Sequence, residues 1–133
     1  MTEKKFKISS DQIKQLIGNM GGCYASDKIL IDGEPVGYRY REEPDDKWYS
    51  GWSFFSGSED QAYADDPRNF AIYEVNTVAN YDQAIIPYLN SEFDWAYQRI
   101  ASTSQFREVP FDQEKEQPNR VPRGLNPRSE ITE

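Results

Sequence analysis

The chain has 133 residues, a length that fits one domain with a core large enough to need no disulfide or metal. It has no histidine and a single cysteine, Cys23, which excludes an intrachain disulfide and leaves too few ligands for a zinc site. Its net charge of -8 disfavours nucleic acid as a partner, because phosphate repels an acidic protein.

Residues 10–20 have the pattern of a short amphipathic helix. Ser9 and Gln12 have the spacing of a capping box, in which two residues satisfy free amides at the start of a helix. The apolar side chains that follow recur at helical spacing: Ile13, Leu16, Ile17 and Met20. Gly21 and Gly22 then favour the end of the helix.

A β-hairpin is predicted around Asp32-Gly33, because this dipeptide favours the tight turn that joins two antiparallel strands. Its arms would be residues 23–31 and residues 34–42. In the second arm, valine and tyrosine alternate with glycine and arginine, so we expect one face of that strand to be buried.

Two further strands are predicted at residues 50–58 and 70–82. In the first of them, Trp52 and Phe54 share one face, which we expect to belong to the core. The polar residues between the two strands make a loop of about a dozen residues, a length at which loops are often functional.

A pair of helices is predicted to follow. Asp82 is expected to cap a short helix that reaches Leu89, and Pro87 should kink or split it. Ser91 and Asp94 have capping-box spacing for a second helix. One face of that helix would carry Phe93, Tyr97 and Ile100.

Residues 1–111 are therefore predicted to form a single α+β domain. It would have a mainly antiparallel sheet of four to five strands, an N-terminal helix and a C-terminal helical pair. Residues 112–133 are expected to be a flexible, proline-rich, charged tail. The chain has neither an apolar run that could span a bilayer nor an apolar signal segment near its first residues, so we expect no membrane partner and a cytoplasmic location.

The excess of acid is concentrated in residues 42–66. This stretch holds eight acids and one base, Lys47, for a net charge of -7, whereas the rest of the chain sums to -1. The acids are Glu42, Glu43, Asp45, Asp46, Glu59, Asp60, Asp65 and Asp66. Such a field favours a basic partner.

Four aromatic residues in the same stretch are hard to bury together with the core strand: Trp48, Tyr49, Phe55 and Tyr63. Aromatic rings with a rim of acids are typical of surfaces that bind another protein. These four rings and the eight acids are therefore the predicted partner-binding site. The alternative is that the rings belong only to the core.

Other sites are weaker candidates. The carboxylates could bind Ca²⁺, which prefers oxygen ligands, but EF-hand spacing is absent. Residues 76–82, NTVANYD, form either a structural turn or a set of polar groups that line a site. Cys23 is predicted to be a core residue rather than a reactive thiol. Without histidine, a Gly-x-Ser-x-Gly motif or a phosphate-binding lysine loop, neither catalysis nor a cofactor is expected.

Several segments together resemble a bacterial family. They are SGWSFFSG at residues 50–57, the run at residues 65–89, and the segments 21–29 and 34–44. Over about residues 21–99 this combination is similar to immunity protein family 33, first described as domain of unknown function 2185. The positions that match the family pattern are Gly51, Trp52, Phe54, Phe55, Ser56, Gly57, Asp66, Pro67, Asn76, Thr77, Asn80, Tyr81 and Asp82.

The resemblance implies a small cytosolic protein, encoded beside toxins, that binds and neutralises a toxin domain. It supplies no catalytic residues. The leading hypothesis is therefore a non-enzymatic binding protein that neutralises a toxin domain through an acidic aromatic surface. The rival hypothesis is a regulatory domain that binds a small ligand or a cation through the acidic loop and residues 76–82. The identity of the partner and the oligomeric state are left open by the sequence.

Overall fold

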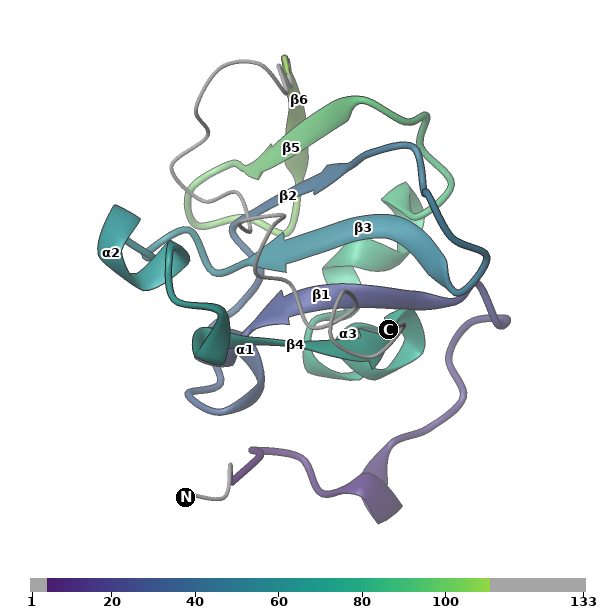
Figure 1. Cartoon of the computed structure of the whole chain (residues 1–133), viewed down its shortest axis with the longest axis vertical. Coiled ribbons are helices and arrows are strands. Elements are labelled where there is room, and N and C mark those ends of the chain that lie inside the picture. Colours follow the sequence, from purple (N-terminus) through teal and green to yellow (C-terminus); the bar gives the residue numbers. More distant parts are fainter. Residues whose placement is uncertain (1–4, 111–133) are drawn as a thin grey trace.

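Six β-strands form one sheet in the order β4-β1-β3-β2-β5-β6 (Figure 1). The computed structural model describes residues 5–110, and the predicted tail, residues 112–133, lies outside the described residues. The strands are β1 (Gly22–Ser26), β2 (Tyr38–Arg41), β3 (Tyr49–Phe55), β4 (Phe70–Glu74), β5 (Trp95–Arg99) and β6 (Phe106–Pro110). Only β1 and β3 pair in parallel; the other neighbours are antiparallel. The α+β class and the mainly antiparallel sheet are confirmed, with six strands rather than four or five.

The helices are all short. They are η1 (Ser10–Gln12), α1 (Asp27–Leu30), α2 (Gln61–Ala64), η2 (Pro67–Asn69), α3 (Val75–Tyr81) and η3 (Gln83–Tyr88), where η marks a 3₁₀ helix. Figure 1 shows α3 behind the sheet and α2 beside one end of β3. Within residues 5–110, no helix combines the length and the apolar character that crossing a bilayer requires.

The predicted hairpin at Asp32-Gly33 is wrong. Strand β3 lies between β1 and β2, so the two expected arms are not neighbours. The side-chain hydroxyl oxygen of Ser26 accepts a hydrogen bond from the N–H of Lys28 and caps α1. Strand β1 therefore ends at Ser26, earlier than predicted. Ile29 and Leu30 are buried residues of α1, so the apolar run that suggested the first arm of a hairpin belongs to a helix.

The predicted N-terminal helix over residues 10–20 is also wrong beyond its first turn. The capping box of Ser9 and Gln12 is present, but the helix ends at Gln12. The side chain of Asn76 accepts the N–H groups of Leu16 (2.8 Å) and Ile17 (3.2 Å) and donates to the carbonyl of Lys14 (2.8 Å). An amide side chain thus satisfies backbone groups that a helix would have paired within itself.

Two more predicted elements change type. The strand expected over residues 70–82 stops at Glu74, and α3 follows with Val75, Val78 and Ala79 buried at helical spacing. The second helix of the predicted pair is strand β5. Asp94 has a positive φ of 69° and donates its N–H to the carbonyl of Arg41, so the chain enters the sheet at this point. The cap at Asp82 is confirmed, because its carboxylate accepts the N–H of Ala84 at the start of η3.

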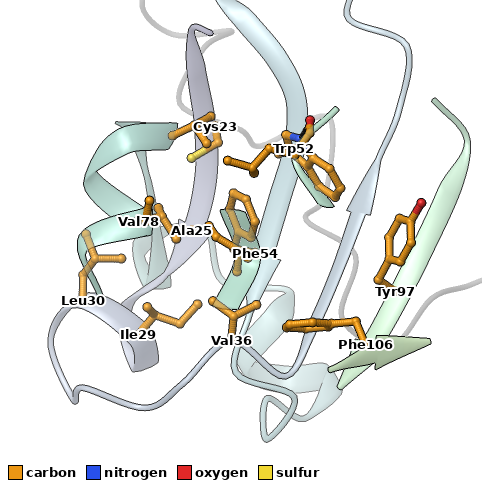
Figure 2. Close-up of a cluster of buried hydrophobic side chains, with 14 residues drawn as sticks. Cys23, Ala25, Ile29, Leu30, Val36, Trp52, Phe54, Val78, Tyr97 and Phe106 are labelled. Carbon is orange, nitrogen blue, oxygen red and sulfur yellow. Dashed lines mark hydrogen bonds between the residues drawn. The ribbon is translucent and has the colours of Figure 1, made fainter. Parts of the chain in front are cut away.

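Both faces of the sheet are apolar. The first face packs against α3 and η3, and Figure 2 shows Trp52 and Phe54 of β3 at its centre. The indole N–H of Trp52 donates to the carbonyl of Leu89 (3.1 Å), which fixes the chain after η3 over the sheet. The second face gathers mainly aromatic residues: Tyr24, Tyr40, Tyr49, Phe55, Ala64, Phe70 and Ala96.

One arginine lies inside the first face. Arg39 of β2 is 0% exposed, and its guanidinium carbon lies 4.5–5.3 Å from the ring centres of four aromatic residues. These are Trp52, Tyr88, Tyr97 and Phe106. Its Nη1 donates to the carbonyl of Ile85 (3.1 Å), whereas Nε and Nη2 have no hydrogen-bond partner among residues 5–110. Burial lowers the pKa of Arg39 to about 9.

Replacing Asn76 by alanine should release the N-terminal segment. The change removes three hydrogen bonds to the backbone of residues 14–17, so we expect the free energy of unfolding to fall by about 1–3 kcal/mol. Amide hydrogen exchange of Leu16 and Ile17 should become fast. Asn90→Ala, at an exposed position, is the matched control and should leave both measurements unchanged.

Replacing Arg39 by methionine should preserve the fold. A buried cation without full hydrogen bonding is costly, so at neutral pH we expect the free energy of unfolding to stay equal or to rise by up to about 4 kcal/mol. The folded-state pKa lies below the ordinary value, so the unfolded chain holds the proton more tightly. The wild type should therefore gain stability relative to the variant as the pH rises above about 9.

The control for this experiment is Arg107→Met at an exposed position, where we expect a change within about 0.5 kcal/mol. A loss of more than about 2 kcal/mol in Arg39→Met at neutral pH would contradict the prediction. It would mean that the four ring contacts outweigh the cost of desolvating the guanidinium.

Candidate functional site

The structure divides the acidic stretch into two groups. Residues 42–48 form the loop that leads into β3, and residues 56–66 follow the end of β3 and include α2. The seven residues of β3 separate the two groups by about 20 Å at the usual rise per residue. Figure 1 shows the β2–β3 loop and α2 at opposite ends of β3. The predicted site is therefore not one continuous surface.

The acids after β3 shape their own loop. Glu59 is 5% exposed and accepts the N–H groups of Ser56 (2.8 Å) and Gly57 (2.9 Å). Asp60 caps α2 by accepting the N–H of Tyr63 (2.8 Å). Each of these carboxylates satisfies backbone amides that would otherwise be unpaired where the strand or helix begins or ends.

The remaining acids of this group are more exposed. Asp66 caps η2 and forms an exposed ion pair with Arg68 (2.9 Å), whose guanidinium lowers the pKa of that carboxyl. Asp65 accepts from the side chain of Gln61 (2.8 Å). In residues 5–110, no three acidic or cysteine side chains gather in the way that a metal ion would need.

Two of the four predicted surface rings are buried. Tyr49 is 4% exposed and Phe55 is 0% exposed, so the expectation that they resist burial is wrong. Both lie on the second face of the sheet, where Phe55 packs on Tyr40 and Phe70 with ring centres 5.9 and 5.6 Å apart. The alternation along β3 was predicted correctly, but the sequence analysis assumed that only one face is covered.

A hydrogen bond from Tyr49 accounts for the burial of Glu42. The hydroxyl of Tyr49 donates to the carboxylate of Glu42 (2.9 Å), which is only 5% exposed. Burial raises the pKa of Tyr49, so the phenol stays protonated and keeps donating. Of the eight acids, Glu42 and Glu59 are therefore interior groups, whereas Glu43 and Asp45 are exposed in the loop before β3.

Trp48 and Tyr63 lie at the edges of the second face and are half-buried. Trp48 lines an open groove of about 710 Å³ together with Met20, Ile72 and Tyr73. The absence of a side chain at Gly22 makes room for the indole, because a Cβ there would lie 2.8 Å from its ring. Trp48 is thus a predicted surface ring that lines a groove.

Residues 76–82 serve the fold. Asn80 accepts the N–H of Lys14 (2.9 Å), and the hydroxyl of Tyr81 donates to the carbonyl of Ile8 (3.1 Å). Asp82 forms an ion pair with Arg99 and accepts the N–H of Val36 (2.9 Å). Together with Asn76, these side chains hydrogen-bond to the N-terminal segment and to the chain before β2. Of the two alternatives for residues 76–82, this favours a structural turn over polar groups that line a site.

A sequence model described as the immunity protein Imm33 domain matches residues 23–110. This segment contains all six strands except the first residue of β1. The chain belongs to the Imm33 family. The resemblance inferred from the motifs is therefore confirmed. No curated protein and no solved structure matches the chain.

Membership in Imm33 supports, at the level of the family, a toxin-neutralising protein with a toxin as its partner and a non-catalytic mode of action. Five of the thirteen motif positions of this Imm33 domain are buried, namely Gly51, Trp52, Phe54, Phe55 and Asn76. Gly51 has a φ of 95°, and a Cβ there would lie 2.2 Å from the carbonyl oxygen of Glu42. Trp52 is fully buried, and Cys23 beside it on β1 is buried with a raised thiol pKa, as expected for a core cysteine.

One exposed feature, the turn from Glu92 to Trp95, was not predicted from the sequence. Phe93 is 41% exposed and Trp95 is 38% exposed. The sequence analysis assigned Phe93 to a helical stripe, although the run Glu-Phe-Asp-Trp of alternating acids and rings was visible. The register of β5 with β2 pairs Trp95 with Arg41, which places this turn beside the loop that begins at Glu42.

Replacing Glu59 by glutamine should destabilise this Imm33 domain, whereas Asp65→Asn should not. Glu59 is a buried carboxylate with several donors, and charged hydrogen bonds of this kind contribute about 1–3 kcal/mol. Chemical denaturation of both variants measures the difference. Equal stability of the two variants would contradict the structural role of Glu59.

Proposed function

We propose that this Imm33 chain is a non-enzymatic inhibitor that acts in the cytoplasm by binding a toxin domain and covering a basic surface on it. The family match over residues 23–110 is the observation that carries this proposal. The composition supports it, because a chain without histidine lacks the base on which most nucleophile pairs depend. Inhibition by occlusion needs only a complementary surface.

The charge of the chain supports a basic partner. The net charge is -8, and the loop before β3 presents Glu43 and Asp45 as exposed carboxylates. Many enzymes that act on nucleic acid carry basic surfaces, because their substrate is a polyanion. An acidic inhibitor is attracted to such a surface at long range, and this attraction raises the rate of encounter.

The rival function, a domain that binds a small ligand, has one observation in its favour. The groove beside Trp48 has a volume of about 710 Å³, within the usual range for ligand sites. The acidic loop after β3 and residues 76–82, which the sequence analysis assigned to this rival, are occupied by hydrogen bonds of the fold. Quenching of tryptophan fluorescence by a metabolite, with a rise in Tm, would favour the rival.

The test of the proposed function begins by locating a toxin gene beside the gene for this chain, as the family resemblance implies, and uses the toxin domain that this gene encodes. Co-expression should restore the growth of cells that produce the toxin domain. The purified proteins should form a complex, and the intact mass of the toxin should be unchanged. A modified toxin would contradict a non-enzymatic mode of action, and the absence of a complex would contradict the proposal itself.

The association rate should depend strongly on salt. Electrostatic steering raises such rates by about 10-fold or more, and salt at about 0.5 M screens it. We expect the rate constant measured by stopped flow to fall by at least about 10-fold between about 0.05 and 0.5 M salt. A rate that does not change with salt would remove the argument for a basic partner.

A further inference from the structure

Two aromatic rings stand exposed on the Glu92–Trp95 turn. Phe93 and Trp95 are two of four large apolar side chains, among residues 5–110, that remain more than a third exposed. The other two are Phe6 and Ile100. Ring side chains of this size bind well when a partner covers them, and tryptophan is among the residues most enriched at the energetic centres of protein interfaces.

The turn is held in a fixed shape by Arg41. Its Nη1 donates to the carbonyls of Leu89 (3.2 Å) and Ser91 (2.7 Å), and its Nε donates to the carbonyl of Ser50 (3.0 Å). The guanidinium carbon lies 4.7 Å from the ring centre of Phe93. The ring of Phe93 thus packs on a cation that is itself hydrogen-bonded to three backbone carbonyls, one in β3 and two in the segment after η3.

Backbone pairing fixes the position of Trp95 in the sheet. The N–H of Asp94 donates to the carbonyl of Arg41 (2.5 Å), and Trp95 begins β5 in register with Arg41. Side chains that are already ordered lose little conformational entropy when they are covered. The ring of Phe93, which rests on Arg41, and the backbone that carries Trp95 are therefore preorganised for binding.

Acidic residues lie near this pair of rings, at the end of the sheet where β2 ends and β5 begins. Glu92 and Asp94 alternate with the two rings, and Glu43 follows β2 next to the start of β5. Glu43 and Glu92 are both exposed. The two remaining exposed apolar residues differ in setting, because Ile100 follows β5 at its opposite end and Phe6 packs on Tyr73 of the far edge strand.

We propose that the Glu92–Trp95 turn, with Glu43 at its rim, is the surface that docks on the basic face of the toxin domain. This inference rests on the proposed function and names the part of the chain that performs it. Phe93 and Trp95 supply the contact area, and the carboxylates supply attraction and register. The sequence analysis placed the contact on Trp48, Tyr49, Phe55 and Tyr63, two of which are interior.

The charge of this surface argues for a basic partner rather than a second copy of the chain. In a twofold dimer the same patch would face itself, so Glu43, Glu92 and their symmetry mates would lie opposite one another. Like charges brought together at an interface weaken it, whereas a surface rich in lysine or arginine would pair with these carboxylates. Arginine on the partner could also stack on Trp95.

The test compares two double variants for binding to the purified toxin domain encoded beside the gene. Phe93→Ser with Trp95→Ser removes the proposed contact, and Phe6→Ser with Ile100→Ser removes two equally exposed apolar residues elsewhere. We expect the first variant to raise Kd by about 30-fold or more, chiefly through faster dissociation, and the second by less than about 3-fold. Both should keep the circular dichroism spectrum of the wild type.

A second pair of variants tests the rim without touching the rings. Glu43→Gln with Glu92→Gln should slow association by about 3-fold or more at low salt, because charge acts mainly on the encounter rate. Asp32→Asn with Asp65→Asn neutralises two exposed acids near the other end of β3 and should slow it less. This pair decides the question if the ring variant fails to fold.

Three results would overturn the inference. If the wild type binds the toxin domain and the ring variant binds within about 3-fold of it, the docking surface is elsewhere while the proposed function stands. If the wild type is a dimer that the ring variant converts to a monomer, the patch serves a second copy. If the wild type does not bind the toxin domain, the proposed function fails and this inference fails with it.

Discussion

Strand β3 is buried at all seven of its positions, and this constraint decides where the charges of the chain can lie. A strand inside a sheet presents side chains to both faces, so a strand covered on both sides has no place for a free carboxylate. The acids that precede and follow β3 in sequence are therefore divided between its two ends. Glu42, whose backbone pairs with Gly51 of the strand, and Glu59 are the two buried acids, and they pair with a phenol and with backbone amides.

The sequence predicts features that local residues decide. The α+β class, the strand that contains Trp52 and Phe54, the cap at Asp82 and the core position of Cys23 all follow from spacing within a few residues. Features decided by distant residues were predicted wrongly. The segment after Gln12 is not helical because its amides bond to Asn76, about sixty residues away in sequence.

The same contrast between local and distant causes applies to the prediction of the candidate surface. The concentration of acid was visible in the composition, but its exposure depends on both faces of β3 being covered, which no local pattern reports. The Glu92–Trp95 turn was hidden because its spacing also suits a helix. Because β5 pairs with β2, beginning with the hydrogen bond from Asp94 to Arg41, the turn leads into a strand instead of a helix.

The order of the strands has a consequence for how the chain assembles during synthesis. Strand β1 is made first, yet both of its neighbours, β3 and β4, come later in the chain. One edge of β1 has no partner until β3 is complete at Phe55, and the other has none until β4 is complete at Glu74, whereas β2 and β3 are joined by a short loop and pair locally. The nascent chain therefore exposes at least one open edge of β1 until β4 is made, a state that favours pairing with other chains.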